Sequence, residues 1–192
     1  NTVAPVWDGN ETWMVLGGAG LFAAFPLVYS TVLSALYMPI ILMVIALIFR
    51  GVAFEFRFKA NKTKHLWDQA FIWGSILSSF LQGVILGAYI QGIKTTNGVY
   101  TGGGLDWLTP FSLFTGVSVV VLYATLGCGW LIFKTEKALQ NKMFEFMPKL
   151  IITLFVIFGC VSIYTPLVHH QIAERWFSQP QIFYFSPVPV LV

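Results

Sequence analysis

The side chains most able to do chemistry are a few charged groups at the edges of long apolar runs. Asp8 and Glu11 lie inside the segment 7–13, which has a tryptophan at each end and is followed directly by an apolar run. A carboxylate placed at membrane depth can take up protons and pass them on, and ionisable groups at that depth are usually functional. The same spacing fits a helix cap, with Asp8 as the N-cap residue and Glu11 three positions later. The two interpretations are compatible, and both stay open at this point.

A second charged group closes the next apolar run. Arg50 stands at the end of that run, and Glu55 and Arg57 follow it closely. One interpretation places Arg50 and Arg57 on one helix face at the membrane surface, with their guanidinium groups in the headgroup region. The other is that Arg50 neutralises a carboxylate at the same level, for which Asp8 and Glu55 are the candidates.

The composition places these groups in a membrane protein. The chain is 57% hydrophobic and 10% charged, whereas a soluble domain has about 25% charged residues. Repeated apolar runs of about 20 residues have the length that crosses a bilayer as an α-helix, and the short alternating strands of a β-barrel are missing. We therefore expect an all-α polytopic transmembrane helix bundle that forms a single membrane domain over residues 1–192.

About five membrane spans are predicted, at residues 13–28, 37–54, 67–91, 110–133 and 148–168. Pro26 is expected to end the first of them. Small residues recur every four positions in the third span, and such residues let two helix backbones approach closely in a membrane. The residues of this predicted packing stripe are Ser75, Ser79, Gly83 and Gly87. The same packing is expected of the glycines in the first and fourth spans, Gly17, Gly18, Gly20, Gly127 and Gly129.

The basic residues predict the orientation of these spans. Nine of the eleven Lys and Arg residues fall at the connections after the second and fourth spans, between residues 50 and 64 and between 134 and 149. Because cytoplasmic loops carry the excess of Lys and Arg, both connections and the N-terminus are expected in the cytoplasm. The loops 29–36 and 92–109 and the tail after His169 are then external. The glycine-rich loop 92–109 is expected to be a flexible turn. Since the basic residues flank apolar runs, the net charge of +3 does not indicate a nucleic-acid partner.

The sequence shows no pattern for a metal or haem site. A haem bundle places histidines on facing helices inside the membrane, but His65, His169 and His170 all lie outside the predicted interior of the spans. Cys128 and Cys160 fall in apolar runs and are expected to be inert. No complete enzyme active site can be assembled from these residues.

Four segments of the first 57 residues together resemble subunit II of the cytochrome bd-type quinol oxidases. Their sequences are most similar to those of the branch called cyanide-insensitive. They are Trp7-Asp8-Gly9-Asn10-Glu11-Thr12-Trp13, Leu16-Gly17-Gly18, Phe22-Ala23-Ala24-Phe25-Pro26 and Phe49-Arg50-Gly51-Val52-Ala53-Phe54-Glu55-Phe56-Arg57. Any one of these segments is a weak signal, and the ordered set is specific. The resemblance covers about half of a full subunit, so further helices are expected before and after this chain.

The resemblance implies a heterodimeric respiratory complex in the bacterial inner membrane, which oxidises quinol and reduces dioxygen to water. Haems b and d then belong to the partner, subunit I, while subunit II supports it without binding haem itself. The family has a proton-path carboxylate at the position of Asp8, and the protons come from the cytoplasm. Trp7 is similar to a residue near a lipid or quinone tail.

Two other functions remain open on the sequence alone. A transporter or channel could also use a carboxylate and arginine path, but it should carry charges near the bilayer midplane, where the last three spans have only Gln82 and small hydroxyls. A pure membrane anchor for a soluble enzyme would make no demand on Asp8 or Arg50. Co-purifying haem separates the oxidase from both alternatives.

Overall fold

The structure is a computed structural model that describes residues 7–168, 174 and 178. Five helices and one small hairpin make up this part of the chain. They are α1 (Trp7–Ala24), α2 (Pro26–Lys59), α3 (Lys64–Ile90), β1 (Thr95–Thr96), β2 (Val99–Tyr100), α4 (Pro110–Lys134) and α5 (Lys137–Val168). The backbones of Trp7 and Asp8 are described, but their side chains lie outside the described part.

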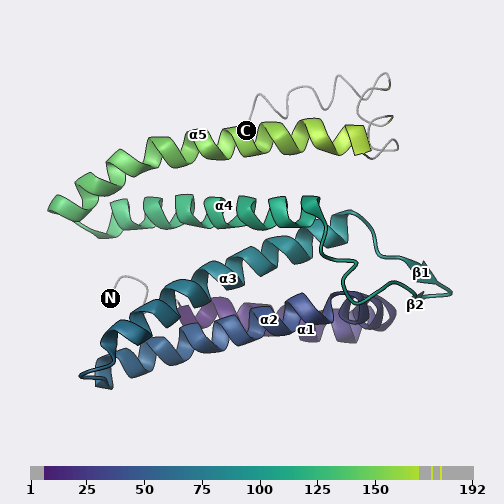
Figure 1. Ribbon diagram of the computed structural model, residues 1–192, viewed down its shortest axis with the longest axis horizontal. Helices are drawn as coiled ribbons and strands as arrows, with labels where there is room; N and C mark the ends of the chain where they lie inside the picture. Colours follow the sequence, from purple (N-terminus) through teal and green to yellow (C-terminus); the bar gives the residue numbers. More distant parts are fainter. Residues whose placement is uncertain (1–6, 169–173, 175–177, 179–192) are drawn as a thin grey trace.

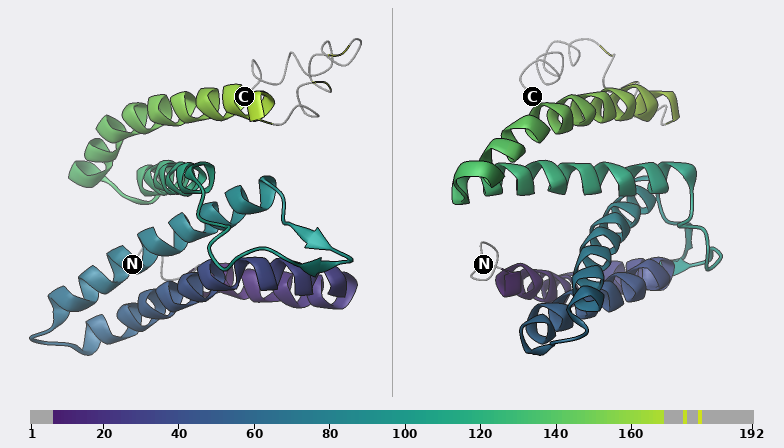
Figure 2. Two further views of the ribbon diagram at one scale, coloured as in Figure 1. Left: turned by 45° about the vertical axis from the view of Figure 1, so that its right-hand side comes forward. Right: turned by 60° about the vertical axis from the view of Figure 1, so that its left-hand side comes forward.

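The helices run back and forth, each beside the one before it (Figure 1). The largest contacts join α2 to α3 and α3 to α4, while α1 contacts α2 much less extensively. Figure 2 shows α3 crossing obliquely between α2 and α4, with α5 on the outer side of α4. The hairpin projects from the end where α3 passes into α4.

The predicted fold class is confirmed, since α2, α3, α4 and α5 are each long and apolar enough to cross a membrane. The chain is therefore a multi-pass membrane protein. Helix α1 forms as a fifth helix but is not among the membrane-length apolar helices of the described chain. Its first two turns include Asp8, Asn10 and Glu11, and these polar residues lower its hydropathy.

The corner between α1 and α2 differs from the prediction. Helix α1 ends at Ala24, two residues before Pro26, as predicted, but Pro26 then begins α2 directly, where its missing N–H leaves no bond unmade. The predicted loop at 29–36 is wrong, because these residues are helical up to a kink at Leu36 (φ −116°, ψ 16°). Pro39 explains the kink, because a proline inside a helix removes one backbone hydrogen bond and clashes with the carbonyl four residues earlier, that of Ala35.

The predicted connection between the last two spans is also wrong in length. Only Thr135 and Glu136 separate α4 from α5, and α5 begins eleven residues before Pro148. The side chain of Gln140 donates to the carbonyl of Ile132 at 2.9 Å, and the thiol of Cys128 contacts the carbonyl of Met143 at 3.3 Å. These contacts hold the first turns of α5 against α4.

Two of the predicted packing residues lie where α3 and α4 approach most closely. A Cβ added to Gly83 would lie 2.6 Å from the carbonyl oxygen of Thr115, and one added to Gly87 would lie 2.7 Å from the Cα of Ser112. Ser75 and Ser79 instead donate hydroxyl hydrogen bonds to carbonyls of their own helix. The predicted packing of Gly17, Gly18, Gly20 and Gly127 is not found in the described chain, since an added Cβ on any of them meets nothing within 4 Å.

The loop 92–109 is folded, in contrast to the flexible turn that was expected. β1 and β2 pair antiparallel around Asn97 and Gly98, which both have positive φ (51° and 78°), as the tight type I′ hairpin turn requires. The Thr31 hydroxyl donates to the carbonyl of Gly98 at 3.0 Å. The hairpin is thereby fixed to the first turns of α2.

Replacing Gly98 by alanine should loosen this hairpin. A side chain in the left-handed region costs about 1–2 kcal/mol, so we expect faster cleavage of the loop by a protease added to the detergent-solubilised protein. Gly104→Ala is the matched control, because an added Cβ there meets nothing within 4 Å and no positive φ is involved. Equal cleavage rates for the two variants would contradict the role of the turn.

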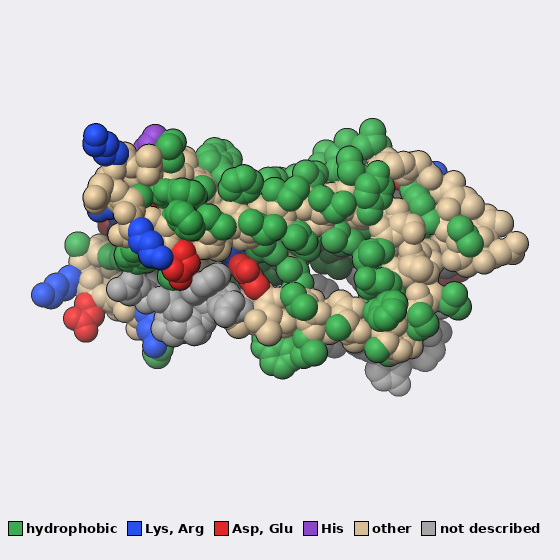
Figure 3. All heavy atoms as spheres, turned by 90° about the horizontal axis from the view of Figure 1, so that it is seen from below, with side chains coloured by type: hydrophobic (Ala, Val, Ile, Leu, Met, Phe, Trp, Pro, Cys, Tyr) green, Lys and Arg blue, Asp and Glu red, His purple; other side chains and the backbone are tan. Residues whose placement is uncertain are grey.

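Basic side chains gather at one end of the molecule. Figure 3 shows Lys and Arg mainly at the end where α2 meets α3 and α4 meets α5 in Figure 1. This distribution agrees with the charge pattern on which the orientation is based. The cytoplasmic position of that end stays a prediction.

Candidate functional site

The central feature of the site is an ion pair between α1 and α2. Nη2 of Arg50 lies 2.6 Å from Oε1 of Glu11, and the two side chains are 24% and 26% exposed. Along α2, Arg50 lies nine residues before Lys59, which corresponds to about 14 Å of helix. The pair is therefore set well inside the end of the helix, and not at its charged tip.

A glycine on α3 lets this pair sit beside a close helix contact. A Cβ on Gly74 would lie 2.8 Å from the carbonyl oxygen of Ala46 and 3.1 Å from the backbone nitrogen of Arg50. Only glycine allows α3 to approach α2 so closely at this level. The contact holds the backbone of Arg50 in place, so that its guanidinium can reach across to α1.

Arg50 pairs with Glu11, a carboxylate that the sequence analysis did not name as its partner. Asp8 and Glu55 were the candidates, but the described contact is with Glu11. Glu55 is exposed, and no salt bridge joins it to Arg50 in the described residues. The side chain of Asp8 lies outside the described part, as does that of Trp7. The sequence signal that could have selected Glu11 is its position one helical turn after Asp8, deeper in the same helix.

The backbone of Asp8 is helical, in contrast to the N-cap position expected of it. Helix α1 begins at Trp7, so Asp8 and Glu11 both lie within its first turns. Acidic residues near a helix N-terminus are still favourable, because the aligned peptide dipoles leave partial positive charge there. The two carboxylates therefore remain at the same polar end of α1.

The ion pair opens into a cavity of about 450 Å³ between the first four helices. Its lining residues come from α1 (Glu11, Met14), α2 (Met43, Leu47, Arg50), α3 (Ser78, Ser79, Gln82) and α4 (Tyr123). The Tyr123 hydroxyl donates to Oε1 of Gln82 at 3.0 Å. The hydroxyls of Ser78 and Ser79 both donate to the carbonyl of Ser75, at 3.1 and 2.9 Å, which leaves their oxygens able to accept hydrogen bonds. Groups of this kind can hydrogen-bond water in the cavity.

The sequence missed the α4 side of this cavity. Gln82 was noticed only as an isolated polar residue, and Tyr123 was not singled out at all. Tyrosine is common in membrane helices, so its type carries no signal. The pairing between two helices only becomes visible once α3 and α4 are placed side by side.

A second ion pair lies at the tip of α2 and α3. Nε of Arg57 contacts Oδ1 of Asp68, and the side chains are 48% and 43% exposed. An exposed pair of this kind contributes little to stability. Arg57 therefore behaves as an interfacial residue, in contrast to Arg50.

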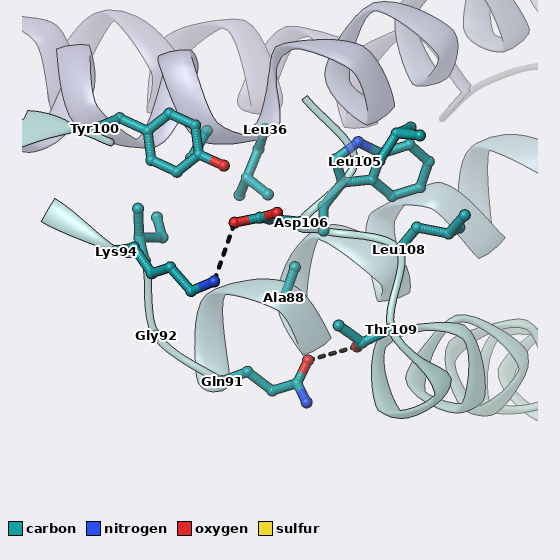
Figure 4. A pocket seen from close by; sticks show the side chains of 13 residues that line it. Leu36, Ala88, Gln91, Gly92, Lys94, Tyr100, Leu105, Asp106, Leu108 and Thr109 are labelled. Carbon is teal, nitrogen blue, oxygen red and sulfur yellow. Dashed lines mark hydrogen bonds and ion pairs between the residues drawn. The ribbon is translucent and has the colours of Figure 1, made fainter. Parts of the chain in front are cut away.

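A second cavity, of about 400 Å³, lies at the opposite end of the molecule, under the folded loop (Figure 4). Nζ of Lys94 lies 3.4 Å from Oδ2 of Asp106, and Thr109 donates to the side-chain oxygen of Gln91. Desolvation raises the pKa of the Tyr100 phenol above its usual value, Asp106 raises it further, and Lys94 opposes this. The phenol therefore stays protonated and donates to the carbonyl of Gly103 at 2.7 Å. The polar side chains of this cavity are therefore paired with one another or with the loop backbone, and they stabilise the fold of the loop.

The described residues offer no haem ligand pair. His65 is the only histidine among them, and it is exposed in the first turn of α3. No group of three His, Cys, Asp or Glu residues that could hold a metal ion occurs in the described part of the chain. Cys128 is buried and Cys160 is exposed. His169 and His170 lie outside the described residues.

The sequence matches one protein family along its whole length. The family model of the cytochrome bd terminal oxidase subunit II aligns with residues 1–192. The chain is 35% identical over 149 residues to the probable cytochrome oxidase subunit 2 of Haemophilus influenzae, with 74% of this chain and 39% of that protein covered.

Two further relatives have similar identity. The chain is 34% identical over 159 residues to the cytochrome bd ubiquinol oxidase subunit 2 of Bacillus subtilis, covering 81% of this chain and 47% of that protein. For the cytochrome bd-I ubiquinol oxidase subunit 2 of Escherichia coli the identity is 36% over 148 residues, with 70% and 38% covered. The matched part is less than half the length of each relative. By the match over all its residues, the chain belongs to the cytochrome bd terminal oxidase subunit II family.

Proposed function

We propose that the chain acts as the haem-free subunit II of a bd-type terminal oxidase in the bacterial inner membrane. In this complex, a partner subunit carries haems b and d, quinol is oxidised and dioxygen is reduced to water. The family match and the relatives' names as cytochrome bd ubiquinol oxidase subunits support this assignment. The chain itself supplies a protein surface for the haem subunit and a route for protons from the cytoplasm.

The ion pair of Glu11 and Arg50 is the observation that carries the proton route. Ionisable residues inside a membrane protein are costly, and those that are present usually serve a function. Oε1 of Glu11 is held by Arg50, while the carboxylate also lines the cavity and its second oxygen can exchange a proton with water there. Arg50 does not release its proton, so it positions the carboxylate and offsets its charge. Asp8, one turn earlier in α1, is proposed as the entry from the cytoplasm.

The reaction chemistry of the complex belongs to the haems and the quinol. Reduction of dioxygen to water consumes as many protons as electrons, and quinol oxidation supplies the electrons. The role of this chain is therefore to deliver protons and to keep the partner in place. Trp7, which precedes Asp8 in α1, is proposed to face a lipid or quinone tail.

The test is to purify the complex from native membranes through a tag on the full-length subunit. We expect haem b and d bands in the reduced-minus-oxidised spectrum, with oxygen uptake that depends on quinol. A haem-free preparation from gently solubilised membranes would contradict the proposal and favour the transporter or channel.

In the same complex, Asp8→Asn and Glu11→Gln should slow oxygen uptake about tenfold or more, because a positioned proton-transfer group contributes at least this much. The haem spectrum should stay unchanged. Tyr89→Phe is a suitable control, since Tyr89 lies on α3 but does not line the cavity. Full activity of both carboxylate variants would exclude this proton route.

A further inference from the structure

The polar groups of the cavity continue inward beyond the ion pair. Tyr123 lies eleven residues before Lys134 at the end of α4, or about 16 Å along the helix. The hydrocarbon core is ~30 Å thick, so the phenol lies near its middle. Gln82 meets it there from α3, with the Tyr123 hydroxyl donating at 3.0 Å.

The polar groups of α3 form a row along one side of the helix. Ser78 and Ser79 precede Gln82 by four and three residues, and residues with this spacing share a helix face. All three line the same cavity as Glu11 and Arg50. The row therefore leads from the ion pair to the contact with Tyr123.

Several donors and acceptors in this row have no partner within the described chain. The amide nitrogen of Gln82 has two N–H groups and no acceptor within the described chain, and the hydroxyl oxygens of Ser78 and Ser79 can each accept. A polar group left unpaired in hydrocarbon is strongly destabilising. Water molecules in the cavity would satisfy these groups, since a buried water makes about three hydrogen bonds.

We infer that Gln82 and Tyr123 hold the inner end of a water chain that carries protons from Glu11 to the middle of the membrane. This rests on the proposed proton role of Glu11. A proton leaves the Glu11 carboxyl along the hydrogen-bonded waters, and each water passes one proton on as it receives another. Gln82 neither gains nor loses a proton, and it orients the water by donating from its amide. The Tyr123 hydroxyl can rotate between donating to Gln82 and accepting from water.

The apolar side chains of the cavity support this function. Met14, Met43 and Leu47 form the rest of its wall, so the groups that can hydrogen-bond water lie along the polar row. A lipid or quinone tail could instead use this apolar wall, and the measurements below distinguish it from water.

The first measurement asks whether water reaches Gln82. In the full complex with its native cysteines replaced, Gln82→Cys should react with a charged, water-soluble methanethiosulfonate at least tenfold faster than Leu86→Cys. Leu86 is the control because it lies one turn later on α3, is 48% exposed, and does not line the cavity. Equal, slow labelling of both would show that lipid or another apolar group fills the site, and would overturn the inference.

The second measurement asks whether protons use the path. Tyr123→Phe and Gln82→Leu should each lower quinol-driven oxygen uptake at least threefold and raise its solvent deuterium isotope effect, with the haem spectrum unchanged. Gln82→Asn should be more active than Gln82→Leu, because the asparagine side chain keeps the amide group. Tyr89→Phe, outside the cavity, should behave as wild type.

The outcomes separate this inference from the proposed function. If Glu11→Gln slows turnover while Tyr123→Phe and Gln82→Leu leave turnover and isotope effect unchanged, the inner path is wrong and the proton role of Glu11 stands. If Glu11→Gln is also fully active, the proposed proton route itself fails, and the inner path fails with it.

Discussion

Arg50→Ala is expected to lower the amount of assembled complex several-fold and to reduce its thermal stability. The substitution leaves the carboxylate of Glu11 inside the membrane region without the guanidinium that lies 2.6 Å from it. Removing one partner of a fully buried ion pair costs about 3–5 kcal/mol. Since both side chains here are about a quarter exposed, we expect about 2 kcal/mol. The measurement is the yield of haem-containing complex together with its melting temperature.

Two controls show whether the effect comes from the ion pair. Arg57→Ala removes a guanidinium from the same helix, but its pair with Asp68 is nearly half exposed and should be worth less than about 1 kcal/mol. Glu11→Gln combined with Arg50→Ala should be less destabilising than Arg50→Ala alone, because no charge is then left unpaired. If the double variant is no more stable than the single one, the pair does not explain the loss.

Gly83→Ala should separate α3 from α4. The new methyl group would lie 2.6 Å from the carbonyl oxygen of Thr115 and 2.8 Å from the Cα of Gly116, and backbone atoms cannot move aside as a side chain can. Inserting one carbon into a tightly packed contact typically costs 1–3 kcal/mol, and this contact is of backbone with backbone. We expect a cost of at least about 2 kcal/mol, measured as a lower melting temperature of the purified complex.

The matched control for this variant is Gly127→Ala on α4. An added Cβ at Gly127 meets nothing within 4 Å, and alanine favours the helix by about 1 kcal/mol over glycine. We therefore expect unchanged or slightly higher stability. Equal melting temperatures for Gly83→Ala and wild type would mean that the two helices do not approach as closely as described.

The long apolar helices were predictable because their signal is strong and local. Helices α3 and α4 begin and end within a few residues of the predicted spans, since Pro110 marks one start and charged residues mark the ends. The continuation of α2 through residues 29–36 was not predictable in this way. A proline usually marks the end of an apolar run, but Pro26 starts a helix and Pro39 kinks one, and the choice depends on how the neighbouring helix packs.

The residues of the site were predictable as types, and their partners were not. Glu11 and Arg50 stood out because each lies at the edge of an apolar run, inside a segment that resembles the family. Which carboxylate contacts Arg50 depends on the position of α1 along the length of α2. No local sequence pattern determines this position. The contact between Gln82 and Tyr123 depends in the same way on the crossing of α3 and α4.

The weak attachment of α1 has a consequence for biosynthesis. An added Cβ on Gly17, Gly18 or Gly20 would meet nothing within 4 Å, and the contacts of α1 within the bundle are mainly with α2. During membrane insertion, α2, α3 and α4 can therefore assemble by their own packing, while α1 joins through Arg50 only after that residue has been synthesised. A subunit in which α1 has not yet docked would expose a charged guanidinium inside the bilayer, where a charge without a partner is costly. We expect the half-life of newly made chains to depend on Glu11 more strongly than the stability of the finished bundle does.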